Sequence, residues 1–169
     1  MIDREGRAAQ RAQAQDQGLA ALCGGLGTAA PVLRHARDDA DATRQALAEL
    51  NETCDLVLSV GGASVGEKDL VKPAIEALGG TLDLWRVRMK PGKPVALAEL
   101  DGRPVVCLPG NPVSSFVTYL LCVTTVLRTL QGAATALPPG LPLRADFDWT
   151  RPDKRREFLR VRLNEAGGV

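Results

Sequence analysis

The spacing of apolar and polar residues predicts helices alternating with strands along most of the chain. A run rich in Ala, Gln and Arg from Arg4 to Leu22 favours a helix, which the glycines that follow it end. Val32 to His35 have the composition of a short strand. A second helix is predicted over Ala42 to Glu52, where apolar residues form a stripe at helical spacing and Asp39 or Asp41 is placed to cap the helix.

The next apolar stretch ends abruptly in glycines. Leu56 to Val60 predict a strand that is buried on both faces. Gly61, Gly62 and Gly66 follow at once, and helical spacing resumes at Leu70. Glycines allow a ligand to approach the backbone, and open α/β sheets bind ligands beyond the carboxyl ends of their strands. This strand, loop and helix are therefore the predicted centre of the chain.

The remaining pattern completes a three-layer α/β fold. Leu82 to Met89 alternate apolar with polar residues, as in a strand with one wet face, and Lys90 to Pro94 interrupt that strand. Val95 to Leu100 and Val105 to Leu108 predict a hairpin, and Val113 to Leu130 predict a long apolar helix. Helices and strands in this order predict a mostly parallel sheet with helices on both faces.

The chain divides into three parts by composition. Residues 1–132 contain the alternating pattern and predict one α/β domain. Residues 133–142 are rich in proline and poor in large apolar groups, as in a linker. Residues 143–169 predict the start of a C-terminal β domain that is incomplete, with strands over Leu143 to Trp149 and Phe158 to Leu163.

Composition narrows the function classes. At 169 residues, with 45% hydrophobic residues, the chain has the profile of a soluble globular protein. Its 21 basic and 20 acidic side chains predict no nucleic-acid or acidic-membrane partner. The four cysteines form no CxxC pair, and the single histidine predicts no zinc site. No signal peptide is recognised and no apolar run is expected to reach the roughly 18 residues of a membrane span, so a cytoplasmic location is expected.

Three loops rich in glycine and proline follow predicted strands, at residues 61–69, 90–94 and 109–115. They combine backbone amides with serine hydroxyls, lysine ammonium groups and carboxylates, which suits a phosphorylated ligand. They match neither the P-loop nor the dinucleotide fingerprint. Simpler structural roles stay open: Asp69 as a helix cap, Lys90 and Lys93 as solvated charges, Asn111 as a plain turn, and Asp38 as a cap.

Together, the motifs GGASVGEKD, MKPGKP and LPGNPVS closely resemble the molybdopterin molybdenumtransferase family, which includes the MoeA enzymes and the gephyrin E domain. The resemblance covers about residues 34–132, and RHARDD resembles an arginine and diacid turn of that family. The molybdopterin adenylyltransferases (Mog, MoaB and the gephyrin G domain) are also similar, but their glycine loop usually reads GGTG. Ser64, Val65 and Gly66 favour the molybdenumtransferases.

The resemblance implies a MoaB/Mog-like molybdopterin-binding fold and the insertion of molybdate into adenylylated molybdopterin with release of AMP, assisted by Mg²⁺. It implies that Asp38 and Asp69 are catalytic residues and metal ligands, with Glu67 a weaker candidate. Ten residues are implied to bind molybdopterin: Gly61, Gly62, Ser64, Gly66, Lys90, Lys93, Pro109, Gly110, Asn111 and Ser114.

The chain also departs from that family. Two N-terminal domains and a strand with a TGDE-like acidic motif have no counterpart, and the first residues are atypical for this domain. Two alternatives therefore stay open beside the molybdenumtransferase: a molybdopterin-binding fragment or subunit without turnover, and a molybdopterin adenylyltransferase. A homo-oligomer, or a partner chain that supplies the missing domains, is a further expectation, together with small-molecule substrates.

Overall fold

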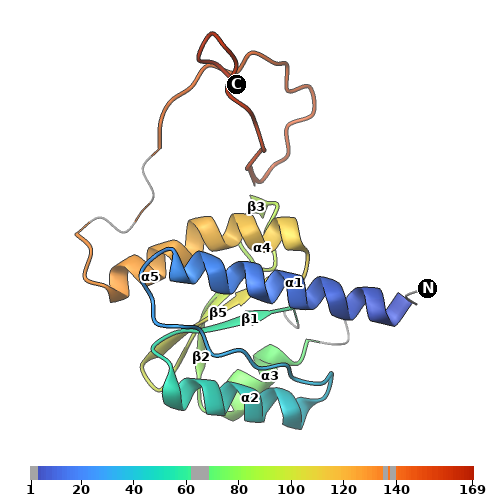
Figure 1. The fold of residues 1–169 in the computed structure, drawn as a ribbon, viewed down its shortest axis with the longest axis vertical. Coiled ribbons are helices and arrows are strands. Elements are labelled where there is room, and N and C mark those ends of the chain that lie inside the picture. The colour runs from blue at the N-terminus through green and yellow to red at the C-terminus, as the bar shows by residue number, and fades with distance from the viewer. Residues whose placement is uncertain (1–3, 62–68, 135–136, 138–139) are drawn as a thin grey trace.

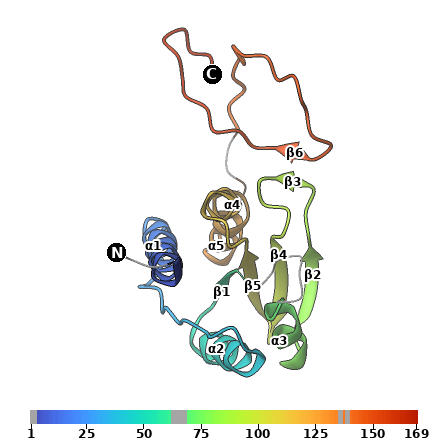
Figure 2. The same ribbon diagram turned by 90° about the vertical axis from the view of Figure 1, so that its right-hand side faces the viewer.

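The computed structural model describes residues 4–61, 69–134, 137 and 140–169, with a four-stranded sheet between two layers of helices (Figures 1 and 2). The strands of this sheet are β1 (Val57–Val60), β2 (Thr81–Trp85), β4 (Ala96–Leu100) and β5 (Arg103–Leu108). The helices are α1 (Arg4–Gly24), α2 (Ala40–Thr53), α3 (Val71–Ala77) and a continuous run of α4 (Pro112–Thr118), the π-helical turn η1 (Tyr119–Val123) and α5 (Thr124–Leu130). Two short strands, β3 (Met89–Lys90) and β6 (Arg156–Glu157), pair separately.

The order of strands in the sheet is β1-β5-β4-β2. β1 and β5 are parallel, whereas β4 is antiparallel to both β5 and β2. β1, β5 and β2 therefore run in the same direction, and the α/β class with helices on both faces is confirmed. Within this four-stranded sheet only the β1–β5 pair is parallel, because a tight turn at Asp101 and Gly102, both with positive φ, folds β4 back beside β5.

The central strand β5 separates two apolar clusters. Val105 and Cys107 pack with residues of α2 and α3, including Leu47 and Ile75. Val106 and Leu108 belong to the cluster that contains Leu19 and Cys23 of α1 and Tyr119, Val123 and Leu127 of the α4–α5 run. Successive residues of a strand point to opposite faces, so this strand is buried on both sides. Because β5 is buried on both faces, it holds the start of the following loop, at Pro109, in place.

Two predictions between α1 and β1 had different outcomes. The Asp39 carboxylate accepts the amide of Ala42 at 2.8 Å, so the predicted cap is confirmed and α2 begins at Ala40. The strand predicted over Val32 to His35 is wrong: these residues are irregular, and Val32 and Leu33 are about half exposed. No neighbouring strand among the described residues pairs with them.

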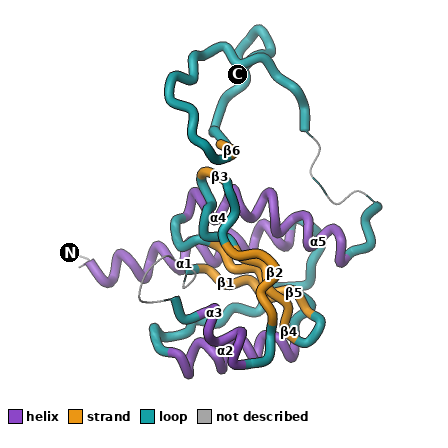
Figure 3. The backbone as a smooth tube through the Cα atoms, turned by 180° about the vertical axis from the view of Figure 1, so that it is seen from behind, coloured by secondary structure: helices purple, strands orange, loops and turns teal. Residues whose placement is uncertain are grey.

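The C-terminal segment, defined as residues 140–169, also differs from its prediction. The strands predicted over Leu143 to Trp149 and Phe158 to Leu163 are not formed, and the described part of the segment contains only the two-residue strand β6. β6 pairs in parallel with β3, and the segment stands beyond this pair, on the side away from the main sheet (Figures 2 and 3). Apolar alternation had indicated strands, but the described chain offers these stretches no sheet to join.

One helical run is longer and more apolar than expected. Pro112–Leu130 has the length and composition of a helix able to cross a membrane, so the expectation that no apolar run reaches this length is wrong. One side of the run packs in the core through Tyr119, Val123 and Leu127. Thr118 and Thr124 fit the helix because their hydroxyls donate to carbonyls one turn earlier.

Candidate functional site

The carboxyl ends of β1 and β5 bring two of the three predicted loops together. The last residue pair of the parallel ladder is Val60 with Leu108, and the Gly61 amide extends it by donating to the Leu108 carbonyl at 3.0 Å. A Cβ placed on Gly110 would lie 3.6 Å from the Gly61 Cα. Gly61 and Gly110, which follow β1 and β5, are thus close neighbours at one edge of the sheet.

The loop from Pro109 to Ser115 is held by its own side chains. The Asn111 carbonyl oxygen Oδ1 accepts the amides of Val113 at 3.0 Å and Ser114 at 3.2 Å, so Asn111 caps α4. The buried Ser115 hydroxyl donates to the Pro109 carbonyl. Asn111 therefore has a structural role in this turn, as the cap of α4, that does not depend on a ligand.

The amides of this loop differ in their availability. The Gly61 amide is engaged in the β1–β5 ladder and cannot also donate to a ligand in this conformation. Within the described part of the chain, the amides of Gly110 and Asn111 have no acceptor, and both residues are exposed. An anion at this edge would therefore meet Gly110 and Asn111 as donors, while Gly61 provides space.

The two predicted carboxylates lie at the starts of two helices. Asp69 Oδ1 accepts the Lys72 amide at 3.3 Å at the beginning of α3. Burial raises the pKa of the Cys107 thiol to about 11, and the Asp69 charge adds to this rise, which places Asp69 near β5. Asp38 is exposed in the turn before α2. No group of three side chains that could hold a metal occurs among the described residues.

Four of the residues named from the sequence cannot be placed. Gly62, Ser64, Gly66 and Glu67 lie outside the described residues. Ser114 is half-buried on α4, and its hydroxyl remains a predicted ligand contact.

The third predicted loop packs against α4, the helix that begins in the loop 109–115. Residues 90–94 continue from β3, which lies beside α4 and next to the C-terminal segment (Figures 1 and 2). Gly92, with φ of 110°, packs against Thr118 of α4. The Lys90 ammonium lies 2.9 Å from Glu157 Oε1 and 3.5 Å from Asp153 Oδ2. Lys93 is exposed.

A polar network surrounds Lys90. Glu157 Oε2 accepts the Trp149 indole N–H at 2.7 Å and the Asp153 amide at 3.0 Å, while Arg155 donates to the Asp153 carboxylate. The Asp153 amide and the Lys90 ammonium lower the pKa of Glu157, and hydrogen bonds from Arg155 hold the pKa of Asp153 well below its usual range. The Glu157 carboxylate in turn raises the pKa of Lys90. All four charged groups are thus in their ionised forms at neutral pH.

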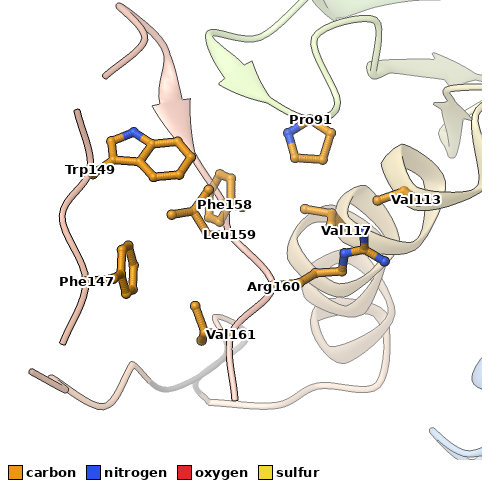
Figure 4. Close-up of a pocket in the computed structure, with 9 residues that line it drawn as sticks. All are labelled: Pro91, Val113, Val117, Phe147, Trp149, Phe158, Leu159, Arg160 and Val161. Carbon is orange, nitrogen blue, oxygen red and sulfur yellow. The ribbon is translucent and has the colours of Figure 1, made fainter. Parts of the chain in front are cut away.

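A cavity of about 470 Å³ opens beside this network, between the C-terminal segment and α4 (Figure 4). Its walls are mainly apolar, and its one charged lining residue is Arg160. The other lining residues are Pro91, Val113, Val117, Phe147, Trp149, Phe158, Leu159 and Val161. The cavity therefore borders residues 90–94 at Pro91 and the start of α4 at Val113, two residues after Asn111.

Residues 1–129 match the family described as "Probable molybdopterin binding domain". The chain belongs to this molybdopterin-binding family. Its relatives include the molybdenum cofactor synthesis protein cinnamon of Drosophila melanogaster, 36% identical over 135 residues, which are 78% of this chain and 22% of the relative. A molybdopterin molybdenumtransferase of Haemophilus influenzae is 36% identical over 118 residues, 68% of this chain and 29% of the relative.

A solved structure agrees with this assignment. The molybdopterin biosynthesis MoeA protein from Pyrococcus horikosii superposes with a TM-score of 0.63 and 28% identity, over 70% of this chain and 29% of that one. The predicted resemblance to the MoeA and gephyrin E-domain family is confirmed. The chain spans about a fifth to a third of the length of these relatives.

Three residues carry contacts that the sequence did not indicate. Gln15 of α1 donates to the Ser115 hydroxyl at 2.6 Å, across 100 positions of sequence. Asp153 and Glu157 hold Lys90 from the C-terminal segment. None lies in a motif; the only signal was the unusual charge density around Asp153.

Proposed function

We propose that this chain binds molybdopterin at the carboxyl ends of β1 and β5 and serves the molybdopterin molybdenumtransferase step of molybdenum cofactor biosynthesis. The observation that carries the proposal is the contact between Gly61 and Gly110, beside the exposed amides of Gly110 and Asn111. Backbone amides converging on an open space favour phosphate oxygens. Relatives named molybdopterin molybdenumtransferases support the same step.

The substrate is proposed to be adenylylated molybdopterin, with molybdate as second substrate and AMP as the product released. The Gly110 and Asn111 amides would donate to phosphate oxygens, and the Ser114 hydroxyl would add a donor. Asp69 and Asp38 are oxygen donors of the kind that Mg²⁺ prefers. Mg²⁺ often binds to one or two carboxylates together with substrate phosphates, so it does not require a cluster of three protein side chains. When bound, the metal would neutralise phosphate charge.

The setting of the reaction is part of the same proposal. We place the chain in the cytoplasm, without a nucleic-acid or membrane partner. Further domains, from a homo-oligomer or a partner chain, would complete the site beside the described edge.

A titration of the purified chain tests the proposal. Molybdopterin and its adenylylated form are added with Mg²⁺ and molybdate, and binding and AMP release are measured. Asn111→Asp keeps the helix cap but adds a negative charge beside the phosphate, so binding should weaken by at least about tenfold. Gln17→Glu, an equivalent change at an exposed position of α1, is the matched control and should bind normally. Absence of saturable binding by the wild type would refute the proposal.

Two results of the same experiment separate the candidate functions. AMP release that is lost in Asp69→Asn indicates the transferase. Saturable binding without AMP release indicates a molybdopterin-binding module. Formation of the adenylylated compound from molybdopterin and ATP would indicate an adenylyltransferase.

A further inference from the structure

We infer that the C-terminal segment is an internal competitor for Lys90: while the segment is docked, Glu157 and Asp153 occupy the lysine, and an anionic ligand group binds Lys90 only when they withdraw. The inference rests on the proposed function in one respect, because it takes the ligand to carry phosphate. It differs from the sequence-based prediction, in which Lys90 is simply available to the ligand.

The ion pairs are built into the pairing of β3 with β6. In the register of this ladder, Lys90 lies directly opposite Glu157, and the ammonium is 2.9 Å from Oε1. Asp153 adds a second carboxylate at 3.5 Å. The Lys90 side chain is nevertheless 46% exposed, so a ligand can reach its ammonium from solvent.

The charges around Lys90 exclude simultaneous occupation. Two positive groups, Lys90 and Arg155, are balanced by two negative groups, Asp153 and Glu157. A phosphate at the ammonium would meet both carboxylates at close range, where like charges repel. Either the phosphate or the acidic pair can hold Lys90, but not both.

The attachment of the segment is weak enough to be displaced. β3 and β6 are two residues long, and their pairing is flanked by amide donations from Arg156 to the Arg88 carbonyl at 2.9 Å and from Phe158 to the Lys90 carbonyl at 2.8 Å. Strand pairs of this size are marginal alone. Partly exposed ion pairs also contribute little each, so a multivalent anion can outcompete them.

Trp149 reports docking, because its side chain lines the cavity between the C-terminal segment and α4. The chain has two tryptophans, so Trp85→Phe leaves Trp149 as the single emitter. In this background, pyrophosphate is titrated as the probe and emission is recorded. We expect a saturable change in emission for the parent protein, and Lys90→Gln should show the changed emission without the probe.

The decisive variant is Glu157→Gln, which keeps an acceptor for Trp149 but removes one competing charge. Its apparent affinity for pyrophosphate should rise about two- to fivefold, the change expected from losing one partly exposed ion pair. Asp148→Asn is the matched control, an exposed acid of the same segment, and should behave like the parent. Far-UV circular dichroism confirms that each variant is folded.

Three results would overturn the inference. Glu157→Gln could bind pyrophosphate with an affinity equal to or lower than that of the parent protein, or show no saturable binding of it. The third is an emission of Trp149 that does not change at saturating pyrophosphate. The proposed function is tested separately, by titrating the wild type and the Asn111→Asp variant with molybdopterin. If pyrophosphate changes the emission of Trp149 but molybdopterin does not bind, the inference about the C-terminal segment stands and the proposed function is refuted.

Discussion

Replacing Asn111 by alanine removes the side-chain cap of the helical run Pro112–Leu130. In the structure, Asn111 Oδ1 accepts the amides of Val113 and Ser114 at 3.0 and 3.2 Å. Aspartate at this position would keep an acceptor in the same place, whereas alanine has none. The pair of variants therefore separates the structural role of Asn111 from its proposed contact with the ligand.

The expected loss of stability follows from the exposure of the cap. Asn111 is exposed, so water can reach the two amides after truncation, and the loss should be that of an ordinary N-cap, about 1 kcal/mol. For a chain of this size, the melting temperature should fall by roughly 2–4 °C. Asn111→Asp should remain within about 0.5 kcal/mol of the wild type, or be slightly more stable, since a negative charge is favourable at a helix N-terminus.

Urea denaturation followed by circular dichroism measures both variants. The midpoint of Asn111→Ala should shift while the slope of free energy against urea stays constant, because the buried surface is unchanged. The reasoning is refuted if the Asn111→Ala variant is as stable as the wild type, or if Asn111→Asp lowers the stability as much as Asn111→Ala does. A stable Asn111→Asp variant that binds molybdopterin poorly would assign both roles to this residue.

Four other outcomes are expected. Gly92→Ala should lower the free energy of unfolding by at least about 2 kcal/mol, because φ is 110° and the new Cβ would lie 2.5 Å from Thr118; an unshifted urea midpoint would contradict this. Ile75→Ala, at a fully buried position, should cost about 2–5 kcal/mol by the same measurement. Cys107, with a pKa of about 11, should resist alkylation at about pH 8 until the protein is denatured; rapid labelling in the native state would argue against its burial. Docking of the C-terminal segment should be fully retained above pH 4.5, the ordinary pKa of the Glu157 carboxyl, and lost as pH falls through its lower folded value; tryptophan emission that changes above about pH 5 would count against the ion pair.

The elements that the sequence predicted correctly are those whose signal is local. β5 and the helical run after it were predicted because apolar periodicity reflects burial within the same few residues. The hairpin around Asp101 was predicted from its turn residues. Val32 to His35 failed because a strand also requires a neighbour, and the residues that would provide one are not local. The C-terminal stretches failed for the same reason.

In the candidate site, too, only the features with a local signal could be predicted from the sequence. Contact between the loops at Gly61 and Gly110 could be predicted, because parallel strands end at the same edge of a sheet. The position of Lys90 could not. Arg86, with a positive φ, directly follows β2 and changes the direction of the chain there. In addition, the partners of Lys90 come from a segment more than 60 residues away in sequence. Ionic contacts of this kind leave no periodic trace in a sequence.

The order of strands also bears on how the site is assembled during folding. β4 and β5 are joined by a two-residue turn and can pair quickly. β1 pairs with β5, with Val57 opposite Val105, only after the intervening chain, which contains α3, β2, β3 and β4, has been brought into a closed loop. We therefore expect β1 to join the sheet late. Because Gly61 and Gly110 meet only through that last pairing, a chain that stalled after the hairpin would contain the residues of the site without its geometry.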